Sequence, residues 1–136
     1  MRRVMVIRST LDQLSAVKQW MRELVERVGL GPREAFDMTL AVHEAVVNAI
    51  LHGNKKDPGK RVEILHLCKN GQLTVQVKDE GGGFDVQGGL AQARKSLAPT
   101  APSGRGLLLI TKLADEVIYN ERGNTVQLTK FVRQRG

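Results

Sequence analysis

The chain has 136 residues, a formal net charge of +7 and one cysteine. This length suits a single core, so we expect residues 1–136 to form one domain. No apolar run approaches the ~20 residues that span a bilayer, and one cysteine cannot form an internal disulfide, which predicts a cytoplasmic protein without a membrane partner. Because the Lys and Arg residues are dispersed and aromatic residues are few, direct nucleic-acid binding is disfavoured, and an acidic or phosphorylated partner suits the charge better.

The N-terminal segment changes from strand-like to helix-like periodicity. Residues 2–8 alternate and are rich in β-branched side chains, which predicts a strand. Apolar residues then recur at helical spacing over residues 11–28, where Ser9 or Thr10 can cap the helix and Gly29 can end it. We therefore expect a strand followed directly by an amphipathic helix.

A second helix is predicted from Gly31-Pro32 to Gly53, because proline suits a first helical turn and glycine ends a helix. Within it, Glu44 and Asn48 interrupt a run, "HEAVVNAILHG", that otherwise has the pattern of a buried amphipathic helix. Residues four apart share a helical face, so the carboxylate and the carboxamide point together into whatever the helix covers. They form either a functional site or structural contacts with a neighbouring loop and a surface cation.

The middle of the chain contains two alternating runs, residues 61–80, joined through Asn70-Gly71, which predicts a β-hairpin. Its second strand ends at Asp79. A helix is predicted over residues 86–95, and residues 96–106, rich in Pro, Ser and Gly, are predicted to form a mobile loop. The hairpin therefore delivers a carboxylate to the start of a glycine-rich segment.

The C-terminal part resumes helical periodicity over residues 106–115, and residues 116–132 read as two strands around a turn at residues 122–124. Hairpin-joined strands and grouped helices predict an α+β fold, a two-layer sandwich with helices on one face of a mainly antiparallel sheet. A ligand pocket is expected between the layers or under the long loop.

Two glycine-rich segments can each approach a ligand. The first, "DEGGG", places Asp79, Gly81 and Gly83 at a strand end, where the backbone can come close and the carboxylate can accept a hydrogen bond from an exocyclic amine. The second, "GRG" at residues 104–106, directly precedes a helix whose free N–H groups can bind an anion. Taken singly, each is equally explained by a flexible turn or a helix break.

The order of the three motifs resembles the N, G1 and G2 boxes of the GHKL (Bergerat-fold) ATPase superfamily. Within it, "EAVVNAILHGN", "DEGGGFD" and "SGRGLLLITKLADEV" are most similar to the small anti-sigma serine kinases of the RsbW and SpoIIAB type. The resemblance covers nearly the whole chain and implies the Bergerat, or histidine kinase-like ATPase, fold. The "SGRG" sequence departs from the commoner "SGMG" and "GGLG" forms, which leaves the role of Arg105 open.

The resemblance also implies ATP and Mg²⁺ as cofactors. Glu44 would be the catalytic base, and Asn48 would bind Mg²⁺ through its amide oxygen. Asp79 would accept a hydrogen bond from the adenine amino group, with Thr125 near the adenine. The nucleotide would be surrounded by the glycines of both boxes and by the arginine between two of them: Gly81, Gly83, Gly104, Arg105 and Gly106.

By the same resemblance, the protein is an ATP-dependent serine/threonine kinase that acts as a partner-switching regulator. It would hold a sigma factor inactive and phosphorylate a STAS-domain antagonist, and a homodimer is a candidate assembly. The alternative is a non-catalytic ATP-binding module that sequesters a sigma factor or another partner.

Two histidines in the second predicted helix raise further questions. His43-Glu44 is similar to the phosphoacceptor motif of histidine kinases, but the same helix already supplies the N box, which disfavours a stand-alone histidine kinase. His52 ends the helix and lies either near the phosphates or against the carbonyls of its own helix.

Overall fold

Five strands form one antiparallel sheet in the order β1-β2-β3-β5-β4 within the part of the chain that the structure describes. The structure is a computed structural model and describes residues 2–69, 71–82 and 105–132. Its elements in chain order are β1 (Arg2–Arg8), the 3-10 helix η1 (Leu11–Gln13), α1 (Leu14–Val28), α2 (Pro32–Asn48), the π-helix η2 (Ala49–Gly53), β2 (Arg61–Lys69), β3 (Gln72–Asp79), α4 (Arg105–Leu113), β4 (Glu116–Tyr119) and β5 (Thr125–Phe131).

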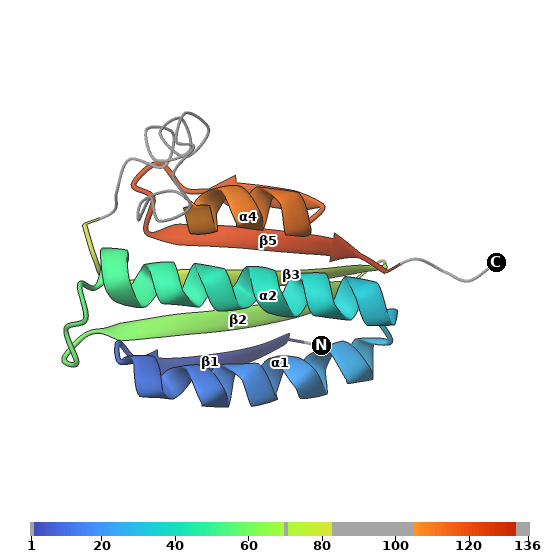
Figure 1. The fold of residues 1–136 in the computed structure, drawn as a ribbon, viewed down its shortest axis with the longest axis horizontal. Helices are drawn as coiled ribbons and strands as arrows, with labels where there is room; N and C mark the ends of the chain where they lie inside the picture. Colours follow the sequence, from blue (N-terminus) through green and yellow to red (C-terminus); the bar gives the residue numbers. More distant parts are fainter. Residues whose placement is uncertain (1, 70, 83–104, 133–136) are drawn as a thin grey trace.

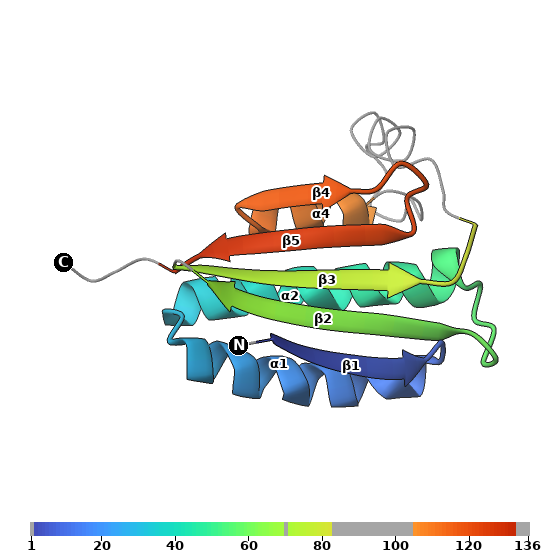
Figure 2. The ribbon, with the colours of Figure 1, turned by 180° about the vertical axis from the view of Figure 1, so that it is seen from behind.

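Helices α1, α2 and α4 cover one face of the sheet, as Figure 1 and the reverse view in Figure 2 show. This arrangement confirms the predicted α+β sandwich, and both predicted hairpins are present, β2 with β3 and β4 with β5. The helix predicted over residues 86–95 lies outside the described residues, as does the predicted loop up to residue 104. Among the helices that are described, none is long and apolar enough to cross a membrane.

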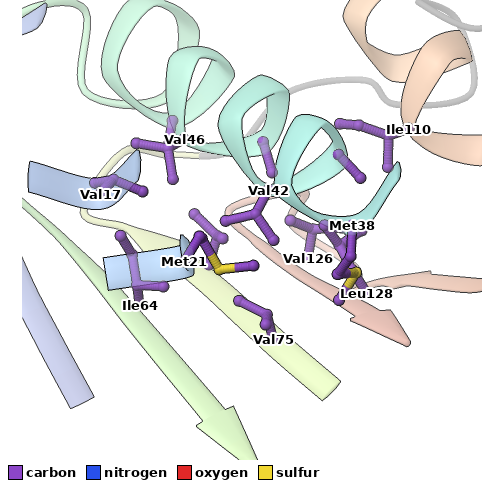
Figure 3. Close-up of a cluster of buried hydrophobic side chains, with 14 of the residues drawn as sticks. Val17, Met21, Met38, Val42, Val46, Ile64, Val75, Ile110, Val126 and Leu128 are labelled. Carbon is purple, nitrogen blue, oxygen red and sulfur yellow. The ribbon is translucent and has the colours of Figure 1, made fainter. Parts of the chain in front are cut away.

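The core lies between the helical layer and the sheet (Figure 3). Alternation along β2 and β3 turns every second residue toward the helices, so Ile64 and Val75 are fully buried. Met21 of α1 and Met38 of α2 belong to the same cluster from the opposite side. Burying side chains of this size contributes about 1.5–3 kcal/mol each, which holds α2 firmly over the middle of the sheet.

The first helix ends as predicted but begins differently. Gly29 follows α1 with a φ of +81°, the left-handed conformation that ends many helices. The first turn is the 3-10 helix η1, whose N-cap residue Thr10 makes no side-chain capping hydrogen bond. Ser9 is fully buried and bonds instead to the Asn54 side chain. The prediction of a Ser or Thr side-chain cap is therefore wrong, because a tertiary contact occupies Ser9.

The second helix spans the predicted limits but changes its geometry on the way. It begins at Pro32, is α-helical to Asn48 and continues as the π-helix η2 to Gly53. The wider π turn brings Gly53 against Asp79, where an added Cβ would overlap the carboxylate. Isolated π turns occur frequently at functional sites, and this one joins the helix carrying Asn48 to the end of β3.

Candidate functional site

A pocket opens between α2, the sheet and the first turn of α4. The lining residues come from the helical layer, from the sheet and from the turn between β4 and β5: Ala45, Asn48, Ala49, Val77, Asp79, Leu107, Tyr119, Gly123, Asn124, Thr125 and Val126. In this conformation its inner space is about 20 Å³, room for about one water molecule. Leu107 and Tyr119 pack against each other. A nucleotide is far larger than this inner space, so it cannot enter it while these two side chains keep their positions.

Asp79 supplies the carboxylate of the pocket at the end of β3. Its side chain is buried, with 5% of the residue exposed, and Oδ1 accepts a hydrogen bond from the Gly81 N–H at 2.8 Å. Burial raises the pKa of Asp79, and the Gly81 hydrogen bond and the charge of Lys60 only partly oppose that change. A carboxylate offers about four acceptor positions, so Asp79 can still accept from a ligand donor.

Gly81 continues the chain where little space remains. An added Cβ at this position would overlap the backbone carbonyl of Gly53, so the close approach of the two segments requires glycine here. The structure thus places the G1 glycine directly on the end of the helix that carries the N box. Gly83 lies outside the described residues.

Asn54 joins the neighbouring ends of β1, β2 and β3, although its position in the sequence does not indicate such a role. Asn54 is fully buried. Its Oδ1 accepts a hydrogen bond from the Glu80 N–H at 2.8 Å, and its Nδ2 donates to the Arg61 carbonyl at 2.9 Å and to Ser9 Oγ. One amide therefore connects the ends of three strands beside Asp79. An asparagine at the start of a polar loop has no sequence signal that separates this role from an ordinary turn.

Glu44 and Asn48 both face the first turn of α4. An added Cβ at Gly106 would lie 3.0 Å from Glu44 Oε2 and 3.3 Å from both Asn48 amide atoms, so glycine allows the two helices to approach. Asn48 Nδ2 is buried without a hydrogen-bond partner among the described residues. The structure therefore brings the predicted base, the predicted metal ligand and the second G2 glycine together.

The turn between β4 and β5 closes the far side of the pocket. Thr125 begins β5, lines the pocket and donates its N–H to Asn120 Oδ1 at 3.1 Å. The neighbouring Asn124 carbonyl accepts from the Asp79 N–H at 3.0 Å, which fixes this turn beside the carboxylate. Thr125 thus lies with Asp79 and Asn48 around one pocket.

The remaining predicted residues either lie outside the described part of the chain or do not line the pocket. Gly104 lies outside the described residues, and Arg105 begins α4, with nothing described of its side chain. His43 lines a separate groove between α1 and α2 with Phe36 and others. His52 is exposed at the end of η2 and does not line the pocket.

The donor set suits a magnesium nucleotide. The amide oxygen of Asn48 is a hard ligand of the kind that Mg²⁺ prefers, and the buried Nδ2, which has no hydrogen-bond partner among the described residues, can donate to an anionic oxygen such as that of a phosphate. The first turn of α4 approaches Glu44 and Asn48, and the free N–H groups of a helix N-terminus suit an anion. The desolvated Asp79 carboxylate lines the same pocket and suits an amino group such as that of adenine.

Comparison with known proteins agrees with this geometry. Residues 7–130 match the sequence profile of the family described as "Histidine kinase-like ATPase domain", and the chain therefore belongs to that family. It is 32% identical over 131 residues to Serine-protein kinase RsbW of Bacillus subtilis (strain 168), an alignment that covers 89% of this chain and 79% of the relative. It is 28% identical over 136 residues to Serine-protein kinase RsbW of Bacillus thuringiensis (strain Al Hakam), covering 96% of this chain and 84% of the relative.

A solved structure agrees in fold. The crystal structure of the RsbU and RsbW domains of a Mycobacterium tuberculosis protein superimposes with a TM-score of 0.66 over 100% of this chain at 19% identity. This chain spans 34% of that longer chain, and at such an identity the likeness shows the fold alone. The predictions of the Bergerat-type fold and of the family are confirmed.

Proposed function

We propose that the protein is an ATP-dependent serine/threonine protein kinase that acts as a partner-switching anti-sigma factor. The names of its relatives support the kinase activity. The observation that carries the proposal is the approach of Gly106 to both Glu44 and Asn48, because it joins a base and a metal ligand to a helix N-terminus. Asp79, at the end of β3, then provides the recognition of the base of the nucleotide.

In this proposal Asn48 offers its amide oxygen to Mg²⁺. Magnesium, when bound, would neutralise charge on the phosphates. Asp79 accepts a hydrogen bond from the adenine amino group, and Thr125 lies near the adenine. The glycines at 81, 83, 104 and 106 leave room for the nucleotide, and Arg105 adds positive charge at the start of α4.

Glu44 has the role of general base. It takes the proton of a serine or threonine hydroxyl on a bound protein while the hydroxyl oxygen forms a bond to the γ-phosphorus, and the bond to the ADP oxygen breaks. The proton stays on Glu44 and ADP is the leaving group. The pocket contributes mainly position, because phosphoryl transfer asks little covalent chemistry of the protein.

The proposed substrate is a STAS-domain antagonist, and the proposed regulated partner is a sigma factor in the cytoplasm. A phosphate on the antagonist adds about −1.5 to −2 charges, which can break a packed interface by repulsion and desolvation. Release of the antagonist would leave the kinase free to bind the sigma factor again. A homodimer is part of the same proposal.

Calorimetry and phosphate transfer test the proposal together. We expect ATP with Mg²⁺ to bind the wild-type protein, and Asn48→Ala to lose the magnesium-dependent part of the affinity. Transfer of labelled phosphate from ATP to STAS-domain proteins of the same genome should stop in Glu44→Gln and continue in Glu26→Gln, an exposed glutamate on α1 that serves as a matched control. Binding without transfer to any STAS protein would support the sequestering module instead, and absence of binding would refute the site.

A further inference from the structure

One hydroxyl in the pocket has no partner among the described residues. Tyr119 ends β4, pairs with Val126 of β5 and lines the same pocket as Asp79 and Asn48. Its hydroxyl is buried and makes no hydrogen bond to any residue that the structure describes. Buried polar atoms in native proteins are almost always paired, so an unpaired phenol at the wall of a pocket requires a physical reason.

Packing does not supply that reason. The ring of Tyr119 contacts Leu107, and a phenylalanine ring would make the same apolar contact without burying an oxygen. The polar groups of the adjacent turn are already paired with one another: the Asn120 side chain bonds to Asn124 and to the Thr125 N–H. The hydroxyl therefore belongs neither to the core nor to the turn.

The chemistry of the hydroxyl defines what it can bind. Burial raises the pKa of Tyr119 to about 12, so the phenol keeps its proton at neutral pH and can donate a hydrogen bond. Asp79 in the same pocket accepts hydrogen bonds. The pocket thus presents a donor from β4 and an acceptor from β3, a combination that suits a nucleoside with both an amino group and acceptor atoms.

We propose that Tyr119 contacts the nucleoside of the bound nucleotide, its hydroxyl donating to an acceptor atom of the base or ribose. This inference rests on the proposed ATP binding and adds to it a contact outside the three glycine and asparagine motifs. Leu107 contacts the ring in this structure, so a ligand that reaches the hydroxyl displaces Leu107 locally and gives the hydroxyl a partner that no described residue provides.

The variant Tyr119→Phe tests the contact because it removes only the oxygen. We expect two opposite effects: the melting temperature of the nucleotide-free protein is unchanged or higher, while the affinity for adenosine and for ATP with Mg²⁺ falls by about 3- to 10-fold, the loss expected for one neutral hydrogen bond. The control Ile118→Val alters the preceding residue, which is exposed, and should leave both quantities unchanged.

A spectroscopic measurement separates contact from structure. Tyr119 is the only tyrosine of the chain, so tyrosine labelled with ¹³C at Cζ gives one resonance, which should shift on saturation with adenosine. Wild-type affinity in Tyr119→Phe, or a loss seen with ATP but not with adenosine, would overturn the nucleoside contact while leaving the proposed function intact. If the wild-type protein itself binds no ATP, the proposed function fails first, and the Tyr119 contact fails with it.

Discussion

Replacement of Asn54 by alanine should destabilise the protein more than any single surface change, because one side chain bridges three strand ends. Asn54→Ala leaves the buried Ser9 hydroxyl, the Arg61 carbonyl and the Glu80 N–H without their partner. An unsatisfied buried group costs about 1–3 kcal/mol, and the two backbone groups belong to exposed residues that water can partly reach. We therefore expect a loss of about 3 kcal/mol, a large fraction of the ~5–15 kcal/mol that holds a domain together.

The matched control is Ser9→Ala, which removes one of the three hydrogen bonds and leaves the other two. Its expected cost is about 1 kcal/mol. Urea unfolding followed by fluorescence reports both variants, because Trp20 is the only tryptophan and its ring lies against His66, with ring centroids 5.3 Å apart. For a chain of this size, 3 kcal/mol corresponds to a melting temperature lower by about 10 °C.

Asn54→Ala should also weaken ATP binding under conditions where the variant is still folded. The Glu80 N–H bond fixes the residue directly after Asp79, so its loss lets the carboxylate and the Gly81 turn move. An Asn54→Ala protein with the same unfolding free energy as Ser9→Ala would refute the bridging role. Reduced stability with unchanged ATP affinity would confine the role of Asn54 to the fold.

Three further predictions follow from particular contacts. Gly81→Ala overlaps a backbone carbonyl and should lower the melting temperature strongly. Gly82→Ala, whose added Cβ has no described residue within 4 Å, should not; equal melting temperatures would contradict this. Because burial raises the pKa of Asp79, stability due to this group is present at low pH and is lost as pH rises from 3.8 through the raised pKa. Asp79→Asn should therefore raise the unfolding free energy at pH 7, and the increase should be smaller near pH 4. The same variant should abolish ATP binding. A variant less stable than the wild type at pH 7 would refute the desolvation argument. Lys130→Met removes the ammonium group that donates to the Leu113 carbonyl at 2.6 Å and lies within 4 Å of the Asp37 and Asp115 carboxylates. The variant should lose about 2–3 kcal/mol of unfolding free energy in urea. A loss under about 1 kcal/mol would show that water takes the place of the ammonium group.

Features set by local chemistry could be predicted from the sequence. Alternation over residues 2–8 matches β1, and Asn70-Gly71 joins the two strands of the predicted hairpin. Gly29 and Pro32 bound the helices where their backbone preferences place them. In each case a few neighbouring residues decide the conformation, so no knowledge of distant segments is needed.

Features set by distant contacts could not be predicted. The π turn at η2 differs from an α turn by one hydrogen-bond step, and a segment of five residues, AILHG, is too short to carry a period that separates the two. Ser9 has the composition of a helix cap, but its hydroxyl pairs with Asn54, 45 residues away. The order of the strands and the position of Tyr119 likewise depend on which segments meet across the sheet.

The prediction of the site rests on the order of the three motifs along the chain and on their resemblance to a known family, not on the conformational preferences of single residues. The roles of Glu44, Asn48, Asp79 and Thr125 stay predictions, although the described geometry gathers these residues around α4 and one pocket. The sequence could not indicate that Gly106 would lie close to both Glu44 and Asn48, because that approach depends on how α4 packs on α2.

Two of the buried polar atoms that lack a partner among the described residues belong to side chains that line the pocket. Asn48 Nδ2 and Tyr119 Oη are buried without partners among the described residues, and the nearby Asp79 carboxylate is desolvated. Burying each of these three groups lowers the free energy of unfolding of the protein without ligand. A nucleotide that forms hydrogen bonds with them removes that cost, so its binding stabilises the folded protein. Because Tyr119 of β4 packs on Leu107 of α4, nucleotide binding is tied to the packing of α4 against β4.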